Sequence, residues 1–109
     1  MNIEIQYLQE AREFLCSMDE NARDKMMHNI DMVSKGVKNT RIFKKLKGTE
    51  LWEFRAEYNG NAYRLFSFWD TRRNALIVAT HGIVKKTQKT PARDIEKANQ
   101  IRLQYFKNN

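Results

Sequence analysis

The pair Asn59-Gly60, set between two runs of strand-like residues, constrains the fold of this chain more than any other feature. Both positions tolerate the positive φ that a two-residue β-hairpin turn requires. In the run before the pair, residues 51–58, every second side chain is apolar, and these side chains are Trp52, Phe54, Ala56 and Tyr58. A period of two predicts a strand with one face toward the core and the other toward solvent.

Two further strands are predicted after this turn. Residues 61–69, NAYRLFSFW, form the partner strand of the hairpin, and the polar segment 70–74 gives the next turn. Residues 75–84 are a nearly continuous apolar run, which is typical of a strand covered on both faces. Together the three runs predict an antiparallel meander.

The beginning of the chain has helical periodicity instead. Apolar residues recur every three or four positions over residues 5–18 and again over residues 22–33. Asp19 is placed to cap the second of these helices, and Lys35 with Gly36 is a suitable end for it. The pattern therefore predicts a helical hairpin.

A third helix is predicted after the last strand. Thr90 is a suitable N-cap and Pro91 a suitable first-turn residue, and apolar residues continue at helical spacing as far as Tyr105. The length of 109 residues fits one ordinary domain. We expect a single α+β domain, residues 1–109, with a small antiparallel sheet of three to four strands, the helical hairpin and a C-terminal helix. Residues 3–5 alternatively form a short strand before the first helix.

Charge is distributed unevenly along the chain. Residues 1–40 carry five Lys and Arg against seven Asp and Glu, whereas residues 41–109 carry fifteen against six. The formal charge of +7 therefore originates in the second part. A basic surface favours a polyanion as a partner.

The sequence also disfavours several classes of protein. Cys16 is the only cysteine, so no disulfide can form within the chain, and no histidine cluster stands at metal-ligand spacing with it. We interpret Cys16 as a small core residue rather than a nucleophile, and His81 as either a buried, satisfied histidine or a strand-end residue rather than a catalyst. The N-terminus has no signal-peptide pattern, and no apolar run approaches the length of a membrane span. We expect a cytoplasmic protein without a metal, a small-molecule cofactor or a membrane partner.

Three motifs follow one another in the basic part: LKGTELWEFR at 46–55, YRLFSF at 63–68 and HGIVKKTQKTP at 81–91. In this order and spacing they resemble the RelE/ParE toxin superfamily, and specifically its phage-associated HigB-like branch. The match runs from about Lys44 to Ala98. The helical hairpin before it fits the superfamily in length and pattern.

The resemblance implies the toxin of a two-gene toxin and antitoxin module, usually a ribosome-dependent endoribonuclease that cuts messenger RNA during translation. It implies a small sheet with two helices against one face and RNA on the concave basic face. The expected partners are a cognate antitoxin, a separate small protein that neutralises the toxin by binding it, and mRNA on the ribosome.

Cleavage of RNA without a metal needs three chemical functions. The 2′-hydroxyl must lose a proton, the charge growing on the phosphoryl oxygens must be stabilised, and the leaving 5′-oxygen must gain a proton. Arg64 matches the arginine that the superfamily uses against the phosphate, and a guanidinium suits this role because it stays charged and donates parallel hydrogen bonds.

The remaining site residues are also implied by the resemblance. Lys86 matches one cation of the superfamily's basic pair, and we expect it to be closest to the scissile phosphate. Glu53 is the candidate general base, at a position where RelE has a lysine, and Arg55 shares its strand face. The predicted RNA-binding residues are Lys45, Lys47, Lys85 and Lys89.

Other interpretations of the same residues remain open. Glu53 and Arg55 also fit an ordinary exposed ion pair, and short runs of lysine at a turn are commonly just solvated. The second functional class is a non-catalytic ParE-like toxin or regulator that binds DNA gyrase or another macromolecule. The combined presence of Arg64, Lys85, Lys86 and the Glu53/Arg55 pair favours the ribonuclease, because a gyrase poison needs no groups for phosphate cleavage.

Overall fold

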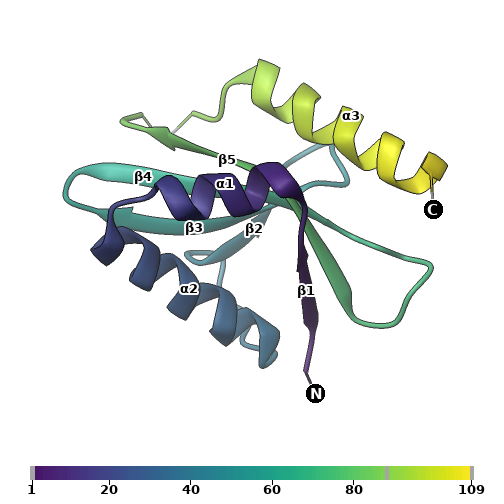
Figure 1. Cartoon of the computed structure of the whole chain (residues 1–109), viewed down its shortest axis with the longest axis horizontal. Coiled ribbons are helices and arrows are strands. Elements are labelled where there is room, and N and C mark those ends of the chain that lie inside the picture. Colours follow the sequence, from purple (N-terminus) through teal and green to yellow (C-terminus); the bar gives the residue numbers. More distant parts are fainter. Residues whose placement is uncertain (1, 88, 109) are drawn as a thin grey trace.

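The computed structural model describes residues 2–87 and 89–108. In chain order its elements are β1 (Glu4–Tyr7), α1 (Gln9–Ser17), α2 (Glu20–Ser34), β2 (Phe43–Lys45), β3 (Trp52–Tyr58), β4 (Asn61–Trp69), β5 (Leu76–Lys85) and α3 (Ala92–Asn108). The strands form one sheet in the order β1-β5-β4-β3-β2 (Figure 1). The predicted α+β class is confirmed. Among the described residues, no helix has the length and apolar character needed to cross a membrane.

The sheet differs from the expected one in strand number and direction. It has five strands rather than three to four, and β1 runs parallel to β5 while the other neighbours are antiparallel. β1 is the strand that the sequence left open. Its four residues end two positions before α1 begins, so the strand is too short to interrupt the helical period clearly.

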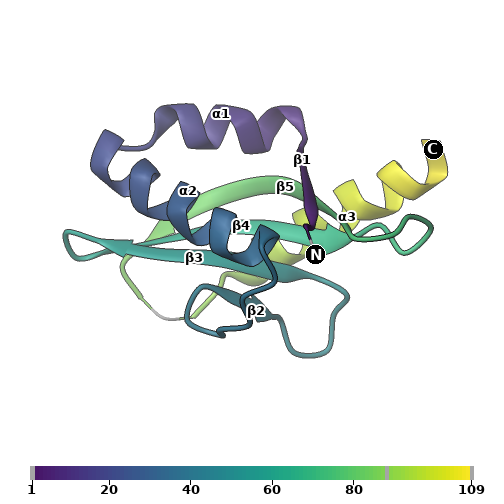
Figure 2. The same cartoon turned by 90° about the horizontal axis from the view of Figure 1, so that it is seen from below.

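The helical hairpin covers one face of the sheet, which we call the first face (Figure 2). α1 packs on β5 and α2 on β3. Asp19 caps α2 as predicted, because its side chain accepts hydrogen bonds from the backbone amides of Asn21 and Ala22. Cys16 is exposed, so its predicted place in the core is wrong. It lies one position after buried Leu15 and therefore on the outer side of the helix.

The β3–β4 hairpin turns at Asn59-Gly60, as predicted. The φ angles are 52° and 79°, both in the left-handed region. The apolar side chains of β3 pack into the first-face core together with Leu65 and Tyr63 of β4. The alternate residues of both strands therefore point to the opposite, second face.

Helix α3 covers part of the second face. Ala98 is fully buried there in a core with Leu51, Phe66, Phe68, Leu76 and Val78. The far end of the helix is held by buried Asp70, which accepts a hydrogen bond of 2.7 Å from the Tyr105 hydroxyl and pairs with Arg72 at 3.2 Å. The bonds from Arg72 and Tyr105 lower the pKa of Asp70 to about 2 despite its burial.

A bulge in β5 determines which side chains meet the start of α3. Thr80 and His81 together oppose the single residue Phe66 on β4. The His81 ring lies 4.9 Å from the Phe66 ring, and its Nε2 is 3.4 Å from Asp94 Oδ1 on α3. Of the two interpretations left open for His81, the structure thus supports the buried, satisfied histidine.

Candidate active site

Four of the predicted site residues meet on the second face of the sheet. Arg55 on β3 stands opposite Arg64 on β4, and Glu53 is two positions before Arg55 on the same face. Lys85 reaches the same place from the end of β5, where it pairs with Ala62. With two further contacting side chains they form what we call the charged cluster, which consists of Glu53, Arg55, Glu57, Arg64, Lys85 and Thr90.

Glu53 is the centre of this cluster. Its side chain is only 5% exposed, and one carboxylate oxygen, Oε2, lies 3.3 Å from Arg55 Nε and 3.6 Å from Arg64 Nε. The other oxygen accepts a hydrogen bond of 3.4 Å from the Thr90 hydroxyl. Glu53 thus lies close to two guanidinium groups through one carboxylate oxygen, while the other oxygen is bonded to Thr90.

Arg64 is completely buried, which is unusual for an arginine. Its Nη1 donates to Glu57 Oε2 at 2.9 Å and to its own neighbour's carbonyl, Tyr63 O, at 3.1 Å. Within the described part of the chain, Arg64 Nε and Nη2 and also Arg55 Nε are buried but make no hydrogen bond, and the two Nε atoms face Glu53 only as ion-pair partners. Buried donors without acceptors are costly, so this place is suited to an additional anion.

Glu57 covers Arg64 from the solvent side. Its side chain is 58% exposed while that of Arg64 has no exposed surface. An exposed carboxylate is easily rehydrated, so the pair can open at a modest cost on the Glu57 side. A phosphate oxygen could then take the place of the Glu57 carboxylate on Arg64 Nη1.

Lys85 is the buried lysine of the site. Its Nζ donates to Thr90 Oγ1 at 3.1 Å, and Thr90 in turn donates to Glu53, so a hydroxyl links the cation to the carboxylate. Burial lowers the pKa of Lys85 below its ordinary value of 10.5, and nearby Arg64 lowers it further, while Glu53 acts in the opposite direction. A lysine in such surroundings gives up its proton more readily than one in water.

A hollow of about 310 Å³ opens beside the charged cluster. It is lined by the β3–β4 turn and by the charged side chains of Lys25 on α2, Glu57 on β3, Lys85 at the end of β5 and Lys86 just after it. Lys25 Nζ also donates to the Glu57 carbonyl. The hollow thus places buried Lys85 beside the exposed cations Lys25 and Lys86.

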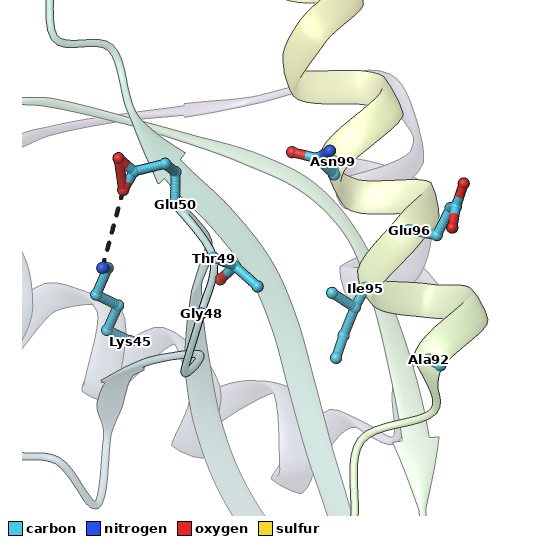
Figure 3. Close-up of a pocket in the computed structure, with 8 residues that line it drawn as sticks. All are labelled: Lys45, Gly48, Thr49, Glu50, Ala92, Ile95, Glu96 and Asn99. Carbon is cyan, nitrogen blue, oxygen red and sulfur yellow. Dashed lines mark ion pairs between the residues drawn. The ribbon is translucent and has the colours of Figure 1, made fainter.

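The other predicted lysines lie outside the cluster. Lys86 and Lys89 are exposed in the segment between β5 and α3. Lys47 is exposed at the β2–β3 turn. Lys45 Nζ is 3.8 Å from Glu50 at the edge of another hollow, of about 550 Å³, between that turn and α3 (Figure 3). Figure 3 shows Lys45 directed toward Glu50, and Lys45 is the one cationic side chain among the described residues that line this hollow.

The structure also brings in residues that the sequence did not single out. Lys44 stands opposite Glu53 in the β2–β3 ladder and is exposed. Glu57 lies two positions after Arg55, so the alternation that predicted β3 also places its side chain on the same face as Glu53 and Arg55. Thr90 was predicted as a helix cap, but α3 begins at Ala92, and the Thr90 hydroxyl bonds to Lys85 and Glu53 instead. No sequence signal points to that connection.

The charged cluster combines the group types needed for proton transfer and phosphate binding. It contains one buried carboxylate, two guanidinium groups with unused donors and one lysine with a lowered pKa. Among the described residues, no group of three or more His, Cys, Asp or Glu is arranged to hold a metal ion.

Comparison with known proteins gives both a family and a fold. Residues 13–103 match the model of a family described as phage-derived Gp49-like proteins (DUF891). A search of curated proteins gave no match. The relationship of this sequence to known proteins therefore rests on the match to the family model.

Solved structures of RelE toxins have the same fold. A mutant of the Escherichia coli toxin RelE in the free state superposes with a TM-score of 0.59 at 12% identity, over 75% of this chain and 82% of that one. The E. coli RelBE toxin–antitoxin complex gives 0.57 at 12%, over 80% and 99%. An archaeal RelE–RelB complex from Pyrococcus horikoshii gives 0.54 at 14%, over 82% and 100%. At such identities the likeness concerns the fold alone.

Proposed function

This chain belongs to the Gp49-like family of phage-derived proteins, and from that membership and its RelE fold we propose that it is the toxin of a type II toxin–antitoxin module. Its proposed activity is ribosome-dependent cleavage of translated mRNA without a metal. Its proposed partners are a cognate antitoxin and mRNA on the ribosome. The proposed site of action is the cytoplasm.

The observation that carries the activity is the state of Arg64. A fully buried guanidinium with two nitrogens that make no hydrogen bond, beside a second, partly buried arginine with one such nitrogen, favours an anionic ligand at this point. An RNA phosphate can accept parallel hydrogen bonds from such a guanidinium. A purely structural ion pair would be expected to use these donors within the protein.

The proposed reaction is an internal transesterification at one phosphodiester. Glu53 takes the proton of the 2′-hydroxyl, whose oxygen attacks phosphorus while the bond from phosphorus to the 5′-oxygen breaks. Arg64 and Arg55 stabilise the negative charge on the phosphoryl oxygens. A lysine gives its proton to the leaving 5′-oxygen, so the products are a 2′,3′-cyclic phosphate and a 5′-hydroxyl.

We assign the proton donor to Lys85 rather than to Lys86. Lys85 is buried, has a lowered pKa and is linked through Thr90 to Glu53, whereas Lys86 is exposed. Lys86, Lys89 and Lys44 then serve as outer contacts to neighbouring phosphates, while Lys45 ends β2 and Lys47 lies in the turn that follows. The ribosome would position the substrate, which can supply much of a barrier when catalytic groups are weak.

The experiment is primer extension on a message translated in a purified system with added protein. Wild type should produce new 5′ ends at ribosome positions, and Arg64→Ala and Glu53→Gln should lower their yield about 100-fold or more. Arg73→Ala is the matched control, because Arg73 is exposed in the β4–β5 turn and away from the cluster. Thermal melting checks that the buried-site variants fold.

Each outcome decides between functions. Loss of cleavage in both cluster variants, with Arg73→Ala active, supports the ribonuclease. Growth arrest by wild type with intact translated and free message would contradict it and favour a toxin that acts only by binding, with DNA gyrase the first target to assay.

A further inference from the structure

An apolar hollow lies on the first face, away from the charged cluster. It has a volume of about 660 Å³ and lies between the end of α2, the loop 35–40 and the ends of the central strands. Six apolar side chains line it, and we call the site the tryptophan groove: Ile3, Val33, Val37, Phe43, Trp52 and Trp69.

The groove presents apolar surface to solvent. Val37 is 38% exposed, and Trp52 and Trp69 are half-buried. These are the only two tryptophans of the chain. Exposed apolar surface within a groove is typical of a site for another molecule, and tryptophan is enriched where binding energy is concentrated.

The rim of the groove is cationic. Lys35 and Lys38 line it, and Asp31, which pairs with Lys35 at 2.9 Å, is the last acidic residue before Glu50. Residues 32–49 contain six Lys and Arg and no acidic residue. The surroundings of the groove therefore complement negative charge.

Two other occupants fit this surface less well than an acidic peptide. Phe43 and Trp52 are stacked on each other with ring centroids 4.8 Å apart, so these faces are already used and are not free to stack on a nucleobase. A second copy would bring two cationic rims together, and each chain has a formal charge of +7. An acidic segment with apolar side chains complements both the apolar lining of the groove and its cationic rim.

We propose that the tryptophan groove binds an acidic, amphipathic segment of the antitoxin. The aliphatic or aromatic side chains of that segment occupy the space between Val37 and the two tryptophans, and its carboxylates meet Lys35 and Lys38. This inference rests on the proposed function, since it presupposes a neutralising protein partner.

The location of the groove has a consequence for inhibition. Phe43 and Trp52 face α2, whereas Glu53 and Arg64 are on the other face of the sheet. A segment in the groove therefore leaves the charged cluster uncovered. Antitoxin binding can be weakened there without removing the groups proposed for cleavage.

The first test uses the protein labelled with 5-fluorotryptophan and the purified product of the adjoining gene as the candidate antitoxin. Both fluorine resonances report on the groove, because both tryptophans line it. Complex formation, followed by size-exclusion chromatography, should shift at least one resonance, whereas a single-stranded RNA should shift neither. A complex with both resonances unchanged would overturn the proposal, as would a shift caused by RNA alone.

The second test compares two substitutions of equal exposure. Val37→Glu puts a carboxylate among the apolar lining and should weaken antitoxin binding at least tenfold. Met27→Glu, on the outer side of α2, alters a side chain that is 39% exposed against 38% for Val37 and should change binding less than twofold. An equal effect of both substitutions would overturn the proposal.

Growth assays separate this inference from the proposed function. Val37→Glu should still arrest growth but escape neutralisation when the antitoxin is co-expressed, which supports both proposals. Arrest with normal neutralisation overturns the groove while leaving the toxin intact. A wild-type protein that neither arrests growth nor cleaves message overturns the proposed function and the groove assignment with it.

Discussion

Lys85 and Lys86 are adjacent in sequence, but their side chains have different surroundings. The last position of β5 directs Lys85 to the second face, where Thr90 and Arg64 are close, while Lys86 follows the strand and is exposed. Burial and the charge of Arg64 make the Lys85 ammonium less favourable, which lowers its pKa. At the scale of single residues, burial decides which of two identical side chains suits proton transfer.

Replacement of the two lysines by methionine should therefore affect different steps, the rate of cleavage for Lys85 and the binding of RNA for Lys86. Lys85→Met, which keeps much of the length but carries no proton, should slow single-turnover cleavage about 100-fold or more at saturating RNA. Lys86→Met should mainly weaken RNA binding, with a much smaller effect on the saturated rate. Quenched time courses at several RNA concentrations measure both quantities. Equal losses of rate would count against the assignment of Lys85.

Lys85→Arg is the control for charge. It keeps a cation but replaces a group that can lose its proton by one that stays charged. RNA binding should be retained while cleavage remains slow. Rapid cleavage by Lys85→Arg would assign Lys85 an electrostatic role only.

At the scale of elements, β5 is fixed by contacts on both faces. A Cβ added at Gly82 would lie 2.2 Å from Phe14 Cδ2, because α1 lies directly against the strand at this point. Glycine is needed here for space rather than for its φ angle. Three residues later the same strand presents Lys85 to the charged cluster.

Gly82→Ala should consequently destabilise the protein by about 1–3 kcal/mol, because the methyl group must displace an aromatic ring in a packed interface. Urea denaturation measures the loss. Gly82→Ala combined with Phe14→Leu should lose less than the sum of the two single variants, since the smaller side chain makes room. Additive losses would show that the two sites do not interact as the structure places them.

Helix α3 has a pH-sensitive attachment at His81. Burial lowers the pKa of His81 below 6.5, and the charge of Lys97 lowers it further. The bond to Asp94 and the charge of Glu10 on α1 act in the opposite direction. As pH falls through 6.5, the unfolded chain takes up the proton before the folded protein does. Acidification from pH 7.5 to 5.5 should therefore reduce the free energy of unfolding.

His81→Gln tests this dependence. Glutamine retains polar atoms near Asp94 but does not titrate, so the decrease in Tm between pH 7.5 and 5.5 should be smaller than in wild type. Thermal melts at several pH values measure the difference. An unchanged pH slope would show that other groups control acid stability.

At the scale of the whole molecule, the two faces of the sheet carry different chemistry. The first face holds the helical hairpin and the tryptophan groove, and the second holds α3 and the charged cluster. Lys44, Lys86 and Lys89 surround the charged cluster by their positions in β2 and in the segment before α3. RNA binding should therefore depend on charge at the second face.

Single-stranded RNA binding should weaken with salt, because each neutralised phosphate releases condensed counterions. The slope of log K against log salt should be about −0.7 per contact. Lys44→Gln combined with Lys86→Gln should reduce its magnitude by about 1.4. Fluorescence anisotropy over a range of salt concentrations measures it.

The control removes the same charge elsewhere. Arg12→Gln combined with Arg73→Gln alters exposed residues on α1 and in the β4–β5 turn, outside the charged cluster. Its slope should equal that of wild type. An equal change in both pairs would mean that RNA responds to net charge rather than to this surface.

Much of the architecture could be read from short-range patterns. The alternation over residues 51–58 predicted that Glu53 and Arg55 share a face, Asn59-Gly60 predicted the turn, and Asp19 predicted the start of α2. All three are as expected. β1 was left open because its pairing with β5 joins segments about seventy positions apart, and such pairing leaves little trace in four residues.

The sequence by itself determined the helices, the hairpin and the residue types of the candidate site, because periodicity and turn conformation are local properties of the chain. Only the tertiary structure decided that Arg64 is buried with unused donors, that Thr90 connects Lys85 to Glu53, and that both tryptophans line one groove. Burial and hydrogen-bond partners depend on segments that are distant in sequence. They arise when β3, β4, β5 and the segment before α3 pack together.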